Sequence, residues 1–390
     1  MTSRFDTFPP RRGLSVKWDA YDADVLPLWV ADMDFPAPEP VTEAMKARAA
    51  SGQFGYEMDA PALREVIAAR MASRYALPTQ PDDVLLQPGL VFSLNVVTRT
   101  YGAPGSPVLI PTPVYQHFIY AAANFQRPAI EVELPSTLRD GWLYYELDFD
   151  ALEAAVTPET SVFLLCNPHN PVGRTFTRAE LERIAEFCLR HNLLLCSDEI
   201  HADLLHPEGA HISIASLGPE IAARTITLVA PSKAFNVPGL QVAAALISNR
   251  ELREQFIQSS HHLGVHASSV GFPGALAAYT QCEGWLAEVL AYLTGNRNAL
   301  LAFVRANWPG VQITKPEATY LAYLDFRGVD LPASPYDFFL KQARVALSDG
   351  PSYGKGGEGR VRLNYGTSRA VLMEALERMD VALKRAGAAG

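Results

Sequence analysis

The sequence has 390 residues, of which 48% are apolar and 19% are charged. This length and composition are typical of a well-packed globular enzyme with one large or two medium-sized domains, and they exclude a disordered or fibrous chain. The formal net charge is −9, which argues against nucleic acid or an anionic membrane surface as the main partner.

The cysteines and the N-terminal residues indicate the cellular compartment. Cys166, Cys188, Cys196 and Cys282 lie in apolar surroundings without CxxC pairing, as core thiols of a reducing compartment do. Residues 1–13 lack the apolar core of a signal peptide, and Pro and Gly interrupt the longest nearly uncharged stretches. We therefore expect a cytoplasmic protein with no membrane span and no metal site.

Short apolar runs alternate with helical patterns through the first two thirds of the chain. The runs "DVLLQPG", "SPVLIPTP" and "SVFLLCNP" each precede a helical stretch, and "LLLCSDE", "TITLVAPS" and "QVAAALISN" follow. Strands that are covered on both faces are apolar without alternation. The pattern therefore predicts an α/β fold with a mostly parallel sheet and helices on both of its faces.

The pattern changes from Val270 onward. Long helical stretches lead to the separated strands "TYLAYLDF", "VALSDG" and "RVRLNYG" and then to a final helix. We expect a large domain at residues 46–275 and a smaller α+β domain at residues 276–390. Residues 1–45 are rich in Pro and aromatic residues, and we expect them to pack on the smaller domain.

Chemically useful residues follow five of the predicted strands. In open parallel sheets, ligands bind at the carboxyl ends of the strands. These ends offer a glycine before a helix, an aromatic ring, an amide, a carboxylate and an amine, namely Gly89, Tyr115, Asn170, Asp198 and Lys233. A lysine at the end of a buried strand is costly unless it is paired, neutral or covalently used.

This set of groups matches the needs of pyridoxal 5′-phosphate. That cofactor needs an amine for a Schiff base and a carboxylate that keeps its ring nitrogen protonated. It also needs a donor to its phenolic oxygen, a ring to stack on, and backbone N–H groups at a helix N-terminus for its phosphate.

Several motifs resemble a known family. "NPHNPVG", "SDEIH" and "SKAFNVPGL" resemble the fold-type I pyridoxal-phosphate enzymes, which include the aspartate aminotransferases (class I/II). Within that family, "WVADMDFPAPEPV", "FGYEM", "TPVYQHF" and "DEIHADL" look like the cystathionine β-lyase and cystalysin-type C–S lyases. The resemblance runs from Trp29 to Arg362, and the order of the motifs carries it more than any single one.

The resemblance implies roles around the cofactor ring. Lys233 would be the Schiff-base lysine and the proton carrier at Cα, and Asp198 would pair with the ring nitrogen. Asn170 would donate to the phenolic oxygen, and Tyr115 would stack on the ring. His201 stands where aminotransferases of the family usually carry tyrosine; it would support Asp198 or the ring oxygen, and a purely structural histidine is the alternative.

The resemblance also implies how the phosphate is held and how chains associate. The expected phosphate ligands are the hydroxyl of Ser232 and the backbone N–H groups of Gly89, Leu90 and Val91. Gln241 replaces an arginine found in many relatives, so neutralisation must depend on dipoles, Ser232 and a partner-chain group. Tyr56 matches a tyrosine that relatives send across a dimer interface, and we therefore expect a homodimer with shared active sites.

Arg362 matches the arginine that holds the substrate α-carboxylate, a task that suits its planar fork. Arg360 is a rival on the same face of the strand, so the pattern alone does not separate the two; the family register favours Arg362. We expect "WVADMDF" to line the substrate entrance through Ala31 and Asp32.

The resemblance implies a C–S β-lyase that cleaves an L-cysteine-derived thioether to a thiol, pyruvate and ammonia, with L-cystathionine as the natural candidate. An aminotransferase would use the same residues and stays open as the alternative. A non-catalytic regulatory protein on this scaffold would lack Lys233 or Asp198, and both are present. A dinucleotide-binding enzyme is disfavoured because no GxGxxG turn follows the first strand.

Overall fold

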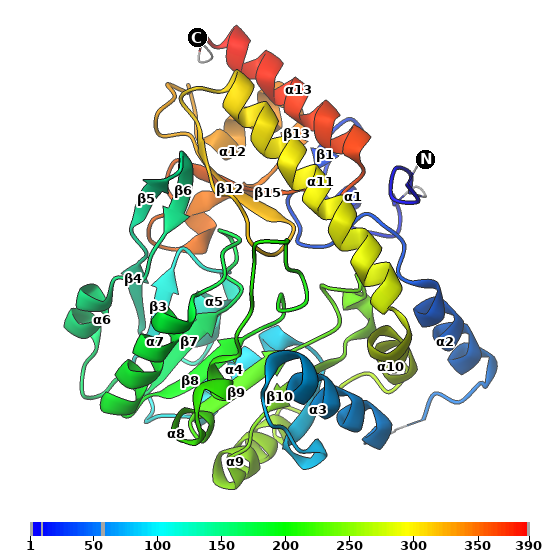
Figure 1. The fold of residues 1–390 in the computed structure, drawn as a ribbon, viewed down its shortest axis with the longest axis vertical. Coiled ribbons are helices and arrows are strands. Elements are labelled where there is room, and N and C mark those ends of the chain that lie inside the picture. The colour runs from blue at the N-terminus through cyan, green and yellow to red at the C-terminus, as the bar shows by residue number, and fades with distance from the viewer. Residues whose placement is uncertain (1–2, 9–10, 56–58, 388–390) are drawn as a thin grey trace.

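The computed structural model describes residues 3–8, 11–55 and 59–387 (Figure 1). Its centre is a seven-stranded sheet in the order β2-β10-β9-β8-β7-β3-β4, in which β10 runs antiparallel to both of its neighbours and the other pairs are parallel. The strands are β2 (Val84–Gln87), β3 (Val108–Thr112), β4 (Ala129–Glu133), β7 (Val162–Cys166), β8 (Leu194–Asp198), β9 (Thr225–Val229) and β10 (Ala243–Leu246). This sheet confirms the predicted mostly parallel α/β fold.

Helices cover both faces of the sheet, which explains why its central strands are apolar throughout. Along β7, Val162 and Leu164 face one core cluster, whereas Phe163 and Leu165 face another. The first cluster includes residues of α4 (Leu90–Thr100), α5 (His117–Asn124) and α9 (Arg250–His261), and the second includes residues of α6 (Phe149–Ala155), α7 (Arg178–Arg190) and α8 (Pro219–Ala222). Each such buried side chain stabilises the fold by roughly 1.5–3 kcal/mol.

The C-terminal part of the chain builds a second, smaller sheet with the order β11-β12-β15-β14. Its strands are β11 (Gln312–Ile313), β12 (Leu321–Asp325), β14 (Ser348–Asp349) and β15 (Arg360–Asn364). The long helices α11 (Glu283–Asn307) and α13 (Arg369–Arg385) lie side by side against it (Figure 1). None of the helices in the described ranges is both long and apolar enough to cross a membrane.

The remaining elements flank these two sheets. The helices are α1 (Val16–Asp19), α2 (Glu39–Ala50), α3 (Pro61–Tyr75), α10 (Phe272–Gln281) and α12 (Pro335–Phe338). The short strands are β1 (Leu26–Pro27), β5 (Ser136–Arg139), β6 (Trp142–Tyr145) and β13 (Val345–Ala346).

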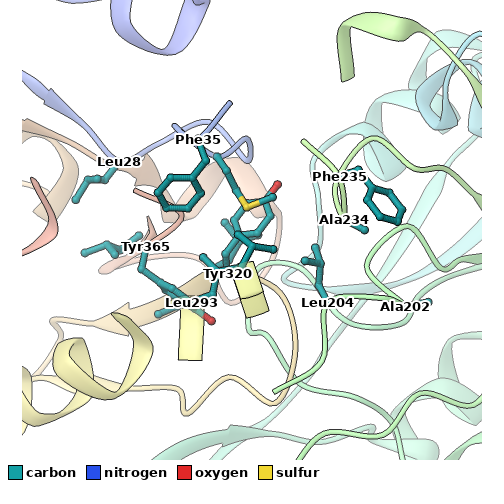
Figure 2. Packing of buried hydrophobic residues seen from close by; sticks show 14 of the residues in the cluster. Leu28, Phe35, Ala202, Leu204, Ala234, Phe235, Leu293, Tyr320 and Tyr365 are labelled. Carbon is teal, nitrogen blue, oxygen red and sulfur yellow. The ribbon is translucent and has the colours of Figure 1, made fainter. Parts of the chain in front are cut away.

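The N-terminal segment packs on the smaller sheet's domain, where β1 pairs with β13 in parallel. Leu28 and Phe35 of this segment belong to the same core cluster as Tyr320 of the small domain and Phe235 of the large one (Figure 2). Asn236, three residues after Lys233, exchanges hydrogen bonds with the backbone of Met33 and Phe35, so the turn that carries this lysine is fixed to the N-terminal segment. The pairing supports the proposed packing of residues 1–45, and we keep the three domain boundaries as a proposal.

Candidate active site

A cavity of about 740 Å³ opens at the carboxyl ends of β2, β3, β7, β8 and β9. These ends share one edge because the last four strands are mutually parallel and β2 is related to β9 through the antiparallel β10. The cavity brings together most of the residues predicted for the site: Ala31, Gly89, Leu90, Val91, Tyr115, Asn170, Asp198, His201, Ser232, Lys233 and Arg362. The N-terminal segment and the small domain supply its opposite wall.

Lys233 lies in the turn after β9, and its Nζ donates a hydrogen bond to the carbonyl of Ala31 at 2.6 Å. Burial lowers the pKa of Lys233 to about 8, and the positive charge of Arg362 acts in the same direction, against the opposing effects of Asp32 and Asp198. A lysine with a pKa near neutrality releases its proton easily, so Lys233 is suited to act as a nucleophile or a base.

Asp198 ends β8 with its side chain buried, where Oδ1 accepts a hydrogen bond from the N–H of Ile200 at 3.1 Å. Burial raises its pKa from 3.8 to about 7. Within the described ranges Asp198 forms no ion pair, so its buried charge needs a donor or cation from elsewhere. The protonated ring nitrogen of pyridoxal phosphate is such a group, and the residues of the cavity therefore fit this cofactor.

The raised pKa of Asp198 predicts how stability depends on pH in cofactor-free protein. Because the folded pKa of about 7 exceeds the ordinary value of 3.8, the stabilising contribution is complete below about pH 4 and is lost as the pH rises through 7. Three pKa units correspond to a loss on the order of 4 kcal/mol. Urea unfolding of cofactor-free wild type and Asp198→Asn should show the variant gaining relative stability up to about pH 7; a gap independent of pH would contradict this.

Arg362 reaches the cavity from β15 with its guanidinium buried. Its Nη1 donates to Oδ1 of Asn170 at 3.0 Å, and its Nη2 donates to Oγ of Ser348 at 3.1 Å and to the carbonyl of Trp29. Its Nε is buried without a hydrogen-bond partner among the described residues. Two N–H groups of this fixed guanidinium, that of Nε and one of Nη1, thus have no partner among the described residues and are available to a substrate carboxylate.

The bond from Arg362 also orients Asn170. Oδ1 of Asn170 accepts from the guanidinium, which leaves its Nδ2 as a donor, and no acceptor within the described ranges uses it. The loop that carries Asn170 is held to the next strand end because its carbonyl accepts from the N–H of Tyr115 at 3.1 Å. This arrangement supports the proposed bond from Asn170 to the phenolic oxygen of the cofactor.

The structure separates the two candidate arginines of β15. Arg360 pairs with Asp325, its cross-strand neighbour on β12, at 3.1 Å between Nε and Oδ2. It does not lie among the residues that line the cavity, whereas Arg362 does. The positions support Arg362 as the carboxylate ligand and give Arg360 a structural ion pair.

His201 and Tyr115 are both uncharged walls of the cavity. Burial lowers the pKa of His201 well below its ordinary value, and the charges of Lys233 and Arg362 lower it further, so the imidazole is neutral. Its Nδ1 is buried without a partner in the described part of the chain. Burial raises the pKa of Tyr115 to about 12, so its phenol stays protonated beside the proposed cofactor ring.

The N-terminus of α4 lines the part of the cavity where we expect the cofactor phosphate to bind. Gly89 is the N-cap residue of α4, and the helix begins at Leu90, so the first-turn N–H groups lack helical partners and form an anion site. Ser232 and the uncharged Gln241 lie at the same cavity. Tyr56, the residue expected from a partner chain, lies outside the described residues.

Two differences separate the sequence-based expectations from the structure. Asp32 was expected at the entrance but does not line the cavity; its Oδ1 lies 3.8 Å from Nζ of the buried Lys17. Conversely, the cavity has lining residues that sequence reasoning missed, and these include Tyr21, Tyr336, Ser348, Asp349 and Tyr353. The polar pair in "VALSDG" at a strand end was a signal for Ser348 and Asp349.

The fold and this cavity define an α/β enzyme with a lysine at the edge of a mostly parallel sheet. A sequence model of the family described as aminotransferase class I and II matches residues 23–379. The chain therefore belongs to this family, as its motifs predicted.

Individual relatives cover almost the whole chain. Cystathionine beta-lyase PatB of Bacillus subtilis is 38% identical over 388 residues, which cover 97% of this chain and 99% of PatB. The crystal structure of cystalysin from Treponema denticola, which contains a pyridoxal 5′-phosphate cofactor, has a TM-score of 0.93 at 32% identity and covers 99% of this chain and 100% of its own. The crystal structure of OvoB has a TM-score of 0.92 at 37% identity, with coverage of 97% and 98%.

Proposed function

We propose that this protein is a pyridoxal-phosphate-dependent C–S β-lyase that converts an L-cysteine-derived thioether and water to a thiol, pyruvate and ammonia. One observation carries the cofactor chemistry: the partly buried Lys233, with a pKa of about 8, lines the same cavity as Asp198, which has no ion-pair partner in the described ranges, and Arg362. The similarity to PatB, named a cystathionine beta-lyase, favours elimination over amino transfer.

Each residue has a distinct task in this reaction. Bound pyridoxal phosphate supplies an electron sink next to the substrate Cα. Arg362 holds the α-carboxylate and so fixes the direction of the Cα–H bond. The amine of Lys233 takes the Cα proton, after which the Cβ–S bond breaks and the thiolate leaves. Asp198 would hold the cofactor through its ring nitrogen and keep that nitrogen protonated, and Asn170 would donate to the phenolic oxygen.

The test is pyruvate release from L-cystathionine without a keto-acid acceptor, followed together with the visible spectrum. A β-lyase should release many pyruvates per active site and keep its visible absorption band. An aminotransferase would instead stop after one turnover with a changed spectrum and would need added keto acid to recover. The second result would move the protein to the alternative class.

The homodimer with shared active sites and the cytoplasmic location belong to the same proposal. Among the described residues that line the cavity, Lys233 and Arg362 are the only Lys or Arg. Lys233 is assigned to the cofactor's imine bond and Arg362 to the substrate carboxylate, so we expect a second chain to supply a further cationic ligand for the phosphate. A mass of 42.6 kDa for the active species in sedimentation would contradict the dimer. All four cysteines are buried and free, which supports a reducing compartment.

A further inference from the structure

Two carboxylates lie among the described residues that line the cavity, and the reaction proposed above uses only one of them. Asp198 stands at the end of β8 and serves the cofactor ring. Asp349 comes from β14 of the small domain, the same strand whose Ser348 hydroxyl accepts a hydrogen bond from Arg362. Asp349 is therefore adjacent to the group that would hold the substrate carboxylate.

No structural role within the described ranges accounts for Asp349. Its Oδ1 is buried without a hydrogen-bond partner, and it forms no ion pair there. It directly precedes the short 3₁₀ turn Gly350–Tyr353, yet its side chain does not cap that turn. The hydroxyl of Ser348, by comparison, has both a donor and an acceptor partner, because it accepts from Arg362 and donates to the carbonyl of Trp29 at 2.8 Å.

The electrostatic surroundings of Asp349 call for a positive charge. Burial and the negative charge of Asp337 raise the pKa of Asp349, and the backbone N–H of Gly350 opposes them. Asp337 itself is paired with Lys341 at 3.0 Å. A half-buried carboxylate next to another negative charge gains most from a cationic partner.

We propose that Asp349 binds a cationic group on the leaving-thiol half of the substrate and so selects thioethers that carry an ammonium there. The inference rests on the proposed lyase function. Asp349 and Arg362 line the same cavity, so the carboxylate of Asp349 can contact the far half of a substrate whose α-carboxylate is held by Arg362. In L-cystathionine the leaving half carries an ammonium three carbons from the sulfur, which meets this requirement.

Three further residues that line the cavity are uncharged and do not compete with Asp349 for an ammonium group. Two of them are Tyr21 and Tyr336, with 3.3 Å between their hydroxyl oxygens, and Trp29 lies beside them. These residues are uncharged, so a lone distal carboxylate, as in aspartate or glutamate, would meet Asp349 without a compensating cation.

The test compares two thioethers that differ in one group, S-(3-aminopropyl)-L-cysteine and S-propyl-L-cysteine. Wild type should favour the aminopropyl compound in kcat/KM by about tenfold or more, since a hydrogen bond to a charged group contributes that much. Asp349→Asn should remove the preference, because kcat/KM for the aminopropyl compound falls by about tenfold more than kcat/KM for S-propyl-L-cysteine. Asp349→Glu, which keeps the charge, should retain a preference.

Asp337→Asn is the matched control, because it removes a neighbouring carboxylate that does not line the cavity and should leave the preference intact. An equal loss on both thioethers in Asp349→Asn would give Asp349 a merely structural role and overturn the inference. Wild type that turns over both compounds without preference would overturn it as well. Wild type that releases pyruvate from neither compound, nor from L-cystathionine, would instead remove the lyase function and the inference with it.

Discussion

Replacing Lys233 by alanine should reduce pyruvate release from a thioether by at least about ten-thousand-fold, the upper range for the loss of a positioned acid–base group. Lys233 is partly buried at the sheet edge, and its Nζ donates a hydrogen bond to the carbonyl of Ala31 at 2.6 Å. Within the described lining residues no other lysine can take the Cα proton. The variant should also lose the visible absorption band that reports a covalent bond between the lysine and the cofactor.

Lys384→Ala is a suitable control for this experiment. Lys384 lies on α13 with a largely exposed side chain paired with Asp380 at 2.7 Å, so its loss should leave both the turnover and the spectrum unchanged. Substantial pyruvate release by Lys233→Ala, measured in single turnovers at high enzyme concentration, would refute the central assignment. A variant that unfolds is recognised by comparing its far-UV spectrum and melting temperature with those of the wild type.

The part of the site that lies at strand ends could be predicted from the sequence. Asn170, Asp198 and Lys233 follow apolar runs that are too uniform for a half-exposed strand, and parallel strands bring their carboxyl ends to one edge. The structure places these three residues around one cavity. Expecting them at one edge of the sheet needed only local patterns and one rule of topology.

The opposite wall could not be predicted in this way, because it depends on how distant segments dock. Tyr21 and Tyr336 are separated by 315 positions, yet their hydroxyl groups lie 3.3 Å apart. Asp32 was expected at the entrance, but the buried Lys17, itself only 15 positions away, lies 3.8 Å from its carboxylate. Periodicity within one element carries no information about such contacts.

The choice between the two arginines of β15 needed the structure for a similar reason. Alternation puts positions 360 and 362 on one face, and both side chains are buried. The register of β12 then sets Asp325 opposite Arg360, which gives that arginine a partner. Arg362 instead lies opposite Ser348 of β14 and beside the cavity.

Arg362→Lys should lower kcat/KM for an L-cysteine thioether by about 100-fold to 1000-fold, mostly through a higher KM. Lysine keeps the charge but cannot supply the planar fork that two parallel bonds to a carboxylate require. Two hydrogen bonds to a charged group contribute about 3–4 kcal/mol together, and every 1.4 kcal/mol is a factor of ten. The substitution of Arg362 also removes the present hydrogen-bond donor to Oδ1 of Asn170 and to the carbonyl of Trp29.

Arg360→Lys provides the matched control, since it makes the same change two residues away on the same strand. Arg360 is buried in an ion pair with Asp325, so this variant should lower the melting temperature while KM stays near that of the wild type. Steady-state kinetics and thermal unfolding of both variants therefore separate binding from stability. If Arg360→Lys raised KM and Arg362→Lys did not, the carboxylate ligand would be Arg360, and the cavity geometry would have to change when substrate binds.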